Sequence, residues 1–371
     1  MKNNRKYISA AFLLISLFSG FMLAGCDQEA LFWVIAHELP PIGPVIGGHP
    51  SPIVLSANTL YVSNDVGIWY WDIVPAPDPV IPNWTLMYPQ PQVRIRDLAV
   101  VGTTLFALDF NGTVHVWNGT NWSDIDGPGT VQRIFGAGSF LFAGTFDGVE
   151  NYAICSMSVP GTALSERQTV DGLLRGAAQS GGTYVLGTQG DGLYTGSGTS
   201  ISKNAAFPDY IMGLTEFAGQ IYIVARDRNY PFGSLYRFGD PTNPINSDLR
   251  FTGAISGWEK SPTERLLLLG IQGAGGSFAN GYREIQIGSG GSFSGSFAIP
   301  GIEEPSSMES GTGNNSAIRS RAINHLYAMP SSYSSGDDIH RPLIFASTQS
   351  GGLWSYRFRN GTAQWNGENN R

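Results

Sequence analysis

The fold of this chain is decided by residues 183–194, which read TYVLGTQGDGLY. An apolar run ends at Gly187, a short polar turn follows, and Gly192 opens a second apolar run. β-Branched and aromatic residues favour strands, and glycine favours the tight turns between them. The stretch therefore predicts two antiparallel strands joined by a short connection. Residues 348–356, which read TQSGGLWSY, have the same layout far along the chain.

Seven short apolar segments share this layout. They are LYVS at 60–63, LFAL at 105–108, LFAG at 141–144, YVLG at 184–187, YIVA at 222–225, LLLG at 267–270 and IFAS at 344–347. Glycine stands three residues before four of these anchor segments, and tryptophan at Trp84, Trp122 and Trp365 marks a further strand in three units. Four short strands in a unit of about 40 residues are typical of a β-propeller blade.

The composition agrees with an all-β chain. Charged residues make up 14% of it, aromatic residues make up 12%, and 48 glycines separate the apolar runs. No long stretch shows the 3.6-residue apolar period of an amphipathic helix. We expect one seven-bladed β-propeller of four-stranded antiparallel blades, with a count of six or eight blades as the alternative.

The best-preserved copies resemble the propeller repeat of two-component regulators. The hallmark of that repeat is an apolar strand, then Gly-Thr, a short turn, and Gly-Leu followed by an aromatic residue. Residues 188–194 and 348–356 match it best, whereas the first, fifth and sixth copies match poorly. The resemblance covers most of residues 51–367, and it implies a propeller that serves as a sensing or binding module.

The N-terminus resembles a bacterial lipoprotein signal peptide. Three basic residues in the first six positions precede an apolar run that ends at Leu23-Ala24-Gly25-Cys26. This is the order of a charged region, an apolar core and small residues before a cleavage site. An uncleaved membrane span is the alternative, but the apolar run is short and no basic cluster follows it. The resemblance implies that Cys26 carries the lipid, palmitate included, and becomes the first mature residue.

These features divide the chain into three parts. We expect a signal peptide at 1–25, a tether or connector at 26–50, and the propeller at 51–367. The propeller then lies in the cell envelope, outside the cytoplasm, and Cys26 anchors it to a bacterial membrane. The choice between inner and outer membrane stays open, because Asp27 retains lipoproteins in the inner membrane of only some bacteria.

Charge and cysteine content narrow the class of partner. The formal net charge is −7, and loss of residues 1–25, which carry three basic and no acidic residues, makes it about −10. An acidic surface argues against nucleic-acid binding.

Cys155 is the only cysteine besides Cys26, so acylation of Cys26 leaves no internal disulfide. Its apolar neighbours predict that Cys155 is a buried, inert thiol.

Recognisable catalytic and cofactor motifs are absent from the sequence. There is no phosphate-binding loop, dinucleotide-binding glycine triplet, His-Glu-x-x-His or Gly-x-Ser-x-Gly. The five histidines lack the spacing of zinc ligands, so we expect neither a metal nor a cofactor. Asp337, Asp338 and His340 form a dense polar cluster. We interpret this cluster as part of a solvated insertion loop, with a metal site or an acid–base site as the alternative.

Propeller geometry predicts one face that gathers the candidate binding residues. The loop between the second and third strands of a blade emerges on the face where the first strand begins. The long loop at 226–233 and the insertions at 272–281 and 301–316 belong to this face, whereas 330–342 belongs to the opposite one. The candidate ligand-binding residues on it are Arg96, Arg175, Arg226, Arg228, Tyr230, Phe232 and Arg321.

Arginines near the start of the inner strands could form a ring at the mouth of the channel. Arg133 occupies a comparable position to Arg96, Arg175 and Arg321. Guanidinium groups suit carboxylates, phosphates and acidic sugars. The alternative is that the arginines pair with acids such as Asp97 or Asp171, or are solvated.

These observations favour a non-catalytic binding or scaffold module whose partner is a protein or a glycan. The alternative is a propeller enzyme of the glycosidase or lyase class that acts on sugars or sugar acids. Carboxylates that face the arginines would favour the enzyme, whereas an apolar or bare mouth would favour binding. A structural role in an envelope assembly is a third possibility.

Overall fold

The computed structural model describes residues 46–73, 83–91, 93–272, 281–298, 318, 322–330, 342–349, 351–359 and 362–368. The chain divides into two compact units, residues 1–42 and 43–371, and all described residues belong to the second. The expected signal peptide, Cys26 and most of the expected connector therefore lie outside the described residues. In the described part, no helix is both long enough and apolar enough to cross a membrane.

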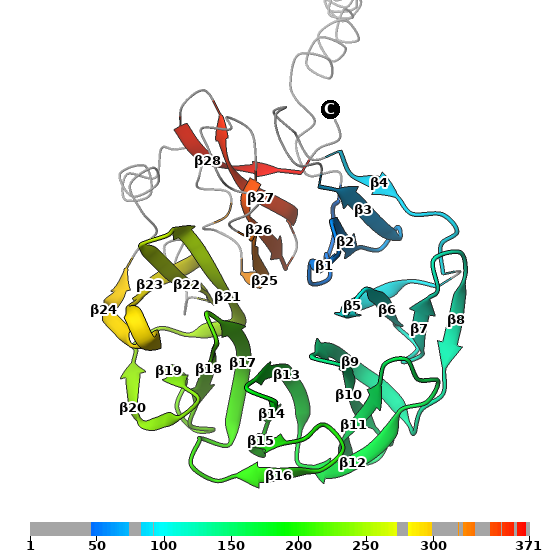
Figure 1. Cartoon of the computed structure of the whole chain (residues 1–371), viewed down its shortest axis with the longest axis horizontal. Coiled ribbons are helices and arrows are strands. Elements are labelled where there is room, and N and C mark those ends of the chain that lie inside the picture. The colour runs from blue at the N-terminus through cyan, green and yellow to red at the C-terminus, as the bar shows by residue number, and fades with distance from the viewer. Residues whose placement is uncertain are drawn as a thin grey trace, which may run out of the picture. The chain divides into compact units, whose positions relative to one another are not determined.

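β-Strands are the main secondary structure of the described residues, as the sequence predicts. Their sheets are antiparallel and stand side by side around a common centre (Figure 1). A single short 3₁₀ turn, η1 (Ser289–Gly291), interrupts the strands of this part of the chain. Within each four-stranded sheet the strand order follows the sequence, so that neighbouring strands are joined by local turns.

Five sheets have four strands each. They are β1–β4 (Val54–Ser56, Thr59–Ser63, Ile68–Asp72, Thr85–Leu86), β5–β8 (Ile95–Val101, Thr104–Asp109, Val114–Trp117, Trp122–Ile125), β9–β12 (Thr130–Ala137, Phe140–Phe146, Tyr152–Ser158, Ser165–Val170), β21–β24 (Phe251–Ser261, Glu264–Ile271, Gly281–Ile287, Phe293–Ala298) and β25–β28 (Ile323–Ala328, Pro342–Thr348, Gly352–Arg359, Thr362–Gly367).

The remaining strands form one eight-stranded sheet. They are β13–β16 (Leu173–Ser180, Thr183–Gln189, Gly192–Gly196, Ile201–Asn204) and β17–β20 (Tyr210–Phe217, Gln220–Arg226, Ser234–Arg237, Asp240–Asn246). The prediction of seven separate four-stranded blades is therefore wrong, because only five sheets have that form. Gln189 at the end of β14 pairs with Tyr210 at the start of β17, and this bridge joins the two groups of strands into one sheet.

The anchor segments found in the sequence all lie in the strands that follow the innermost ones. These strands are β2, β6, β10, β14, β18, β22 and β26. The glycines that precede four of the anchors, Gly102, Gly138, Gly181 and Gly219, all have positive φ in the turn before the strand. Such a backbone conformation is easy for glycine and strained for other residues, so these four turns require it.

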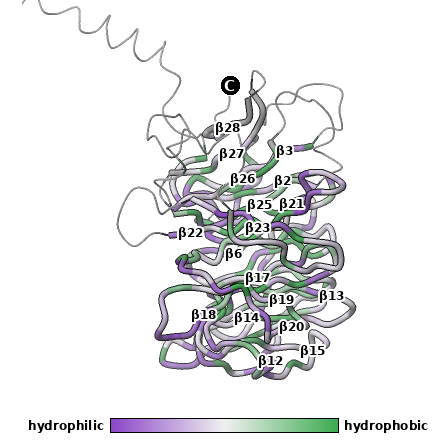
Figure 2. Tube along the Cα trace, turned by 90° about the vertical axis from the view of Figure 1, so that its left-hand side faces the viewer, coloured by the Kyte–Doolittle hydropathy of each residue, from purple (hydrophilic) through white to green (hydrophobic). Residues whose placement is uncertain are grey.

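Packing between neighbouring sheets buries both faces of the anchor strands. In β10, Leu141 and Ala143 pack toward β6 in one core cluster, whereas Phe142 packs toward β14 in the next. This alternation has the two-residue period of a strand. Apolar residues accordingly recur along the strands throughout the described part (Figure 2). Each sheet is therefore stabilised mainly by its neighbours.

Residues from the two ends of the described chain meet at β27. The backbone N–H of Leu353 donates to the carbonyl of Ile46 at 2.9 Å, and the N–H of Glu368 donates to the carbonyl of Leu353 at 3.0 Å. The indole Nε1 of Trp84, beside β4, donates to Glu368 Oε2 at 2.9 Å. These bonds close the ring of sheets.

Candidate functional site

A cavity of about 800 Å³ lies at the centre of the ring. Its walls come from all the innermost strands, which are β1, β5, β9, β13, β17, β21 and β25, and from the residues just before β1. A volume of this size is typical of small-molecule sites. We call this space the central cavity.

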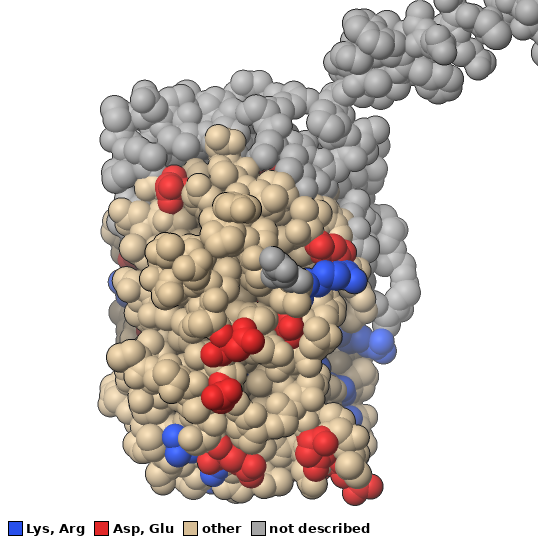
Figure 3. Space-filling view, turned by 90° about the vertical axis from the view of Figure 1, so that its right-hand side faces the viewer, with Lys and Arg blue, Asp and Glu red and all other residues tan. Residues whose placement is uncertain are grey.

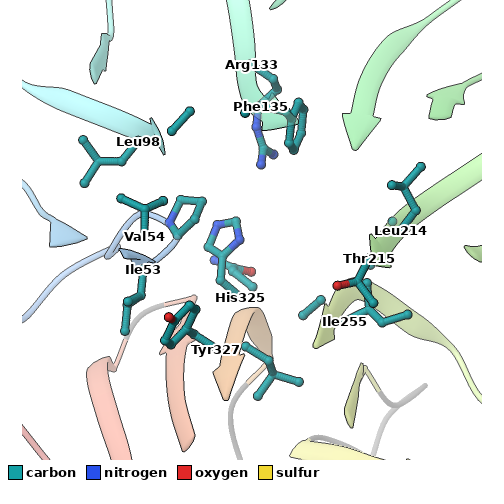
Figure 4. Close-up of a pocket in the computed structure, with 18 of the residues that line it drawn as sticks. Ile53, Val54, Leu98, Arg133, Phe135, Leu214, Thr215, Ile255, His325 and Tyr327 are labelled. Atoms are coloured by element: carbon teal, nitrogen blue, oxygen red, sulfur yellow. The ribbon is translucent and has the colours of Figure 1, made fainter. Parts of the chain in front are cut away.

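Apolar side chains, polar side chains and backbone groups all contribute to the wall of the central cavity. Leu98, Leu214 and Ile255 contribute apolar surface, and Phe135 contributes an aromatic ring (Figure 4). At Gly136 the wall comes very close to the neighbouring strand, since an added Cβ would lie 1.9 Å from the carbonyl oxygen of Val100 on β5. The cavity is thus built from tightly packed strands rather than from loops.

Arg133 reaches into the central cavity from β9 (Figure 4). Its Nε donates to Asp97 Oδ2 at 2.9 Å, and the Asp97 side chain on β5 is 2% exposed. The same carboxylate accepts the backbone N–H of Leu98 and of Ile134. Because Asp97 holds Nε from the neighbouring sheet, the outer nitrogens of Arg133 can point into the cavity.

His325 faces the same space from β25 (Figure 4). Burial lowers the pKa of His325 to about 3, and the charge of Arg133 lowers it in the same direction. The imidazole is therefore neutral at physiological pH, and the neighbouring cation favours this neutral form. In the sequence His325 is one of five scattered histidines, and nothing in its spacing predicted its position in the cavity.

Arg175 of β13 also lines the central cavity, as the channel-mouth prediction requires. Its Nε and Nη2 both donate to the side-chain oxygen of Gln189, and the Gln189 amide donates to the hydroxyl of Tyr210. Desolvation lowers the pKa of Arg175, and the charge of Arg133 lowers it further. Arg175 is therefore a partly buried cation whose hydrogen-bond partner in the described residues is neutral.

Of the other two arginines expected at the channel mouth, Arg96 is among the described residues. Arg96 is not among the residues that line the cavity, because its Nη2 donates to the backbone carbonyl of Val131 on β9. Desolvation lowers the pKa of Arg96. Arg321 lies outside the described residues. Of the four arginines at comparable positions in the sequence, Arg133 and Arg175 line the cavity.

A second region of interest is the surface formed by the loops that join β12 to β13, β14 to β15, β16 to β17 and β18 to β19. We call it the loop face. Residues of all four loops line one hollow of about 610 Å³. The loop that leads into the first strand of a unit and the loop between its second and third strands therefore emerge on the same side. A second hollow of about 890 Å³ adjoins it and shares Pro208, Asp227 and Asn229 with it.

The predicted loop 226–233 is held in place by its own arginines. The guanidinium of Arg226 lies 4.0 Å from the centre of the Tyr210 ring, and its Nη1 donates to the carbonyls of Arg228 and Tyr230. Arg228 extends across to the neighbouring loops, where its Nη2 donates to the Gly190 carbonyl at 3.1 Å. Arg226 therefore supports the loop, while Arg228 is 58% exposed on the loop face.

Tyr230 and Phe232 line the second hollow together with Tyr236. The rings of Tyr230 and Phe232 meet edge to face with their centres 5.2 Å apart, and Tyr230 is 55% exposed. The hollow thus combines exposed aromatic surface with the polar groups of Asn246 and Ser247.

Aspartates surround the first hollow. Asp171, Asp191, Asp209 and Asp227 line it, against the two cations Lys203 and Arg228. The Lys203 ammonium lies 2.7 Å from Asp191 and 3.3 Å from Asp209, and Arg228 lies 3.4 Å from Asp171. The hydrogen bonds from Lys203 and Tyr194 lower the pKa of Asp191 despite its partial burial, which raises it. The hollow keeps an excess of negative charge.

Other sequence predictions fall elsewhere. Cys155 is buried, as expected, and desolvation raises the pKa of its thiol. The insertions at 272–281, 301–316 and 330–342, with Asp337, Asp338 and His340, fall almost wholly outside the described residues. Within the described residues, no group of three or more His, Cys, Asp or Glu could hold a metal ion. Charged side chains stand singly or in small groups on the face shown in Figure 3.

Comparison with known proteins identifies the fold. No protein-family model matches the chain, and no curated protein matches it. The WD40 β-propeller domain of Doa1 is 11% identical, with a TM-score of 0.50 over 83% of this chain and 93% of that one. The structure of YCF48 bound to a D1 peptide is 12% identical, with a TM-score of 0.50 over 87% and 96%. A chain of the mitotic checkpoint complex is 12% identical, with a TM-score of 0.51 over 84% and 90%.

The chain is a β-propeller. Identities this low show the fold alone, because a fold of this kind hosts many unrelated functions.

Proposed function

We propose that this propeller is a non-catalytic binding module that holds a protein partner on its loop face. The observation that carries the proposal is the pair of adjoining hollows, which together offer exposed aromatic surface and fixed charge on four loops. Loops on a rigid scaffold are where recognition residues concentrate. Tyrosine and arginine are also enriched among the residues that dominate binding energy.

The charges of the loop face favour a partner segment with basic and aromatic or apolar side chains. The first hollow carries four aspartates against Lys203 and Arg228, so a basic side chain would gain from entering it. The second hollow would receive an aromatic or apolar side chain beside Tyr230 and Phe232. Arg226, braced on Tyr210, keeps the loop between the two hollows in one conformation.

Two neighbours in fold support a protein partner over a glycan. One of them is YCF48 in complex with a D1 peptide, and the other belongs to the mitotic checkpoint complex. The sequence left a glycan partner open. A glycan remains an outcome of the test below.

The enzymatic alternative has less support from the described residues. An enzyme that acts on sugars needs an acid and a base that converge on the substrate. Among the described residues that line the central cavity there is no aspartate or glutamate. The titratable groups on its walls besides tyrosine are Arg133, Arg175 and His325.

The proposal includes attachment to a bacterial membrane through lipidated Cys26, with the propeller in the envelope. It rests on the resemblance of residues 1–26 to a lipoprotein signal peptide and of the repeat to the two-component-regulator type. A tethered propeller searches for its partner at a high local concentration along the membrane, so that a modest affinity suffices.

A capture experiment tests the proposal. The Cys26-anchored protein is cross-linked in its native membrane, and the captured material is compared with that of the double variant Arg228→Ala/Tyr230→Ala. We expect the variant to lose the partner, since truncation of such exposed anchors costs about 2 kcal/mol or more. Loss of the captured band on protease treatment indicates a protein, whereas loss on periodate treatment alone indicates a glycan.

The matched control is the double variant Lys260→Ala/Arg265→Ala. These residues lie at the turn between β21 and β22, at the opposite end of the strands, and form exposed ion pairs with Glu264 and Glu259. Equal capture by wild type and by the Arg228→Ala/Tyr230→Ala variant would exclude the loop face, and loss in the control alone would place the partner on the opposite face.

A further inference from the structure

We infer that the central cavity is a second binding site, distinct from the loop face, for a small organic anion whose carboxylate or phosphate group is held by Arg133 and Arg175 beside His325. The inference rests on the charges, the hydrogen-bond donors and the shape of the cavity.

The charge balance of the cavity favours an anion. Two arginines line it, and among the described lining residues no acid does. Asp97 neutralises Arg133 from behind, but the hydrogen-bond partner of Arg175 is the neutral amide of Gln189. Within the described part of the chain Arg175 has no acidic hydrogen-bond partner, and a partly buried cation is unfavourable without a counter-ion, so a bound anion would supply a favourable charge.

The donors of the two arginines are arranged for such a ligand. Arg133 uses Nε for Asp97, and Figure 4 shows its guanidinium directed into the open space of the cavity. Arg175 uses Nε and Nη2 for Gln189, and its remaining nitrogen is available to a ligand. Fixing one edge of a guanidinium orients the other edge, which suits the two oxygens of a carboxylate or phosphate.

The electrostatic influence of Arg133 on its neighbours supports this assignment. Its charge lowers the pKa of Arg175 and that of His325, in each case after the larger effect of desolvation. Three groups on three different strands therefore share a region of positive potential. An anion placed there would stabilise all three, and it would favour protonation of His325.

The rest of the cavity indicates an organic ligand. About 800 Å³ is far more than a bare inorganic ion occupies. Leu98, Leu214 and Ile255 offer apolar contacts, while Thr215 and Asn324 offer hydrogen bonds to hydroxyl groups. A sugar acid or a similar hydroxylated carboxylate has this combination of groups.

Isothermal titration calorimetry with defined probes tests the inference. The probes are glucuronate, its uncharged analogue glucose, and inorganic phosphate. We expect glucuronate to bind the wild-type propeller and glucose to bind at least about tenfold more weakly, because only the carboxylate engages the arginines. Phosphate binding tighter than glucuronate would assign the site to phosphate esters.

Single substitutions locate the binding. Arg175→Met should weaken glucuronate binding at least about tenfold, and His325→Gln should abolish proton uptake on binding at about pH 5. Arg265→Gln is the matched control, because Arg265 lies on β22 in an exposed pair with Glu259. Circular dichroism and the thermal midpoint of each variant show that the fold is intact.

The results separate this site from the proposed function. Glucuronate binding that survives Arg175→Met, or no binding of any probe at millimolar concentration, overturns the inference. The Arg228→Ala/Tyr230→Ala variant, which tests the loop face, should bind glucuronate like the wild type. A failure of partner capture therefore leaves the anion site standing, and the reverse also holds.

Discussion

Removing the imidazole of His325 should change how the stability of the propeller depends on pH. The pKa of this histidine falls from its ordinary value of 6.5 to about 3 on folding, because burial disfavours the charged form and Arg133 lies nearby. Above pH 6.5 the residue is neutral in both states and imposes no penalty. As the pH falls below 6.5, the unfolded chain binds a proton that the folded chain does not, so the folded state loses stability.

The size of the effect follows from that one proton. Between pH 6.5 and about pH 4.5, the free energy of unfolding should fall by about 2 kcal/mol more in the wild type than in His325→Gln. Most of this difference should appear below about pH 6, and it should level off near the folded-state pKa. Glutamine keeps a polar side chain at the cavity wall but does not titrate.

Urea denaturation at a series of pH values measures the effect. Aspartates and glutamates also titrate in this range, so only the difference between the two proteins is informative. His49→Gln serves as the control, because His49 is exposed. Parallel stability curves for the wild type and His325→Gln would refute the reasoning, since they would mean that His325 binds its proton equally well in both states.

Three further predictions concern packing and attachment. Trp84→Ala should lower the free energy of unfolding by about 3–5 kcal/mol in a denaturant titration, because the indole is fully buried and its hydrogen bond to Glu368 closes the ring; a loss below about 1 kcal/mol would contradict this role. Gly136→Ala should destabilise the fold by about 1–3 kcal/mol, because the new Cβ would meet the Val100 carbonyl oxygen at 1.9 Å; an unchanged thermal midpoint would show that β9 can move away. Cys26→Ser should abolish labelling by a radioactive fatty acid, and equal labelling of mutant and wild type would rule out the lipobox.

The architecture could be predicted because its determinants are local in the sequence. Every anchor segment proved to be a strand of the expected kind, since the glycine turn, the apolar run and the next glycine specify a hairpin without help from the rest of the chain. The prediction of seven separate four-stranded blades was wrong for a different reason. Whether Gln189 pairs with Tyr210 depends on how two neighbouring units approach each other, and a repeat pattern carries no information about that.

The candidate site could be predicted only in part. Alignment on the anchors placed Arg133 and Arg175 near the starts of the inner strands, and both line the central cavity. The same alignment included Arg96, which instead bonds to a backbone carbonyl on β9. The spacing from the anchor segment predicts the position of a side chain along its strand. Contacts with the neighbouring sheet determine whether that side chain points into the central cavity. The position of His325 was not predicted, because the interval between the sixth and seventh anchor segments is the longest in the chain and the alignment of its unit is least certain there.

The closure at Leu353 has a consequence for how this molecule could be rebuilt. Its N–H is bonded to Ile46 and its carbonyl to Glu368, so the first and last described segments flank a single residue. If the chain is trimmed to residues 46–368, the segments that meet here can be joined by a short linker and new ends opened in any surface turn. A circular permutant with ends at Gly219 would keep every sheet, and a tether attached there would leave from a different side of the ring. The position of the tether and the orientation of the loop face relative to the membrane could then be chosen independently.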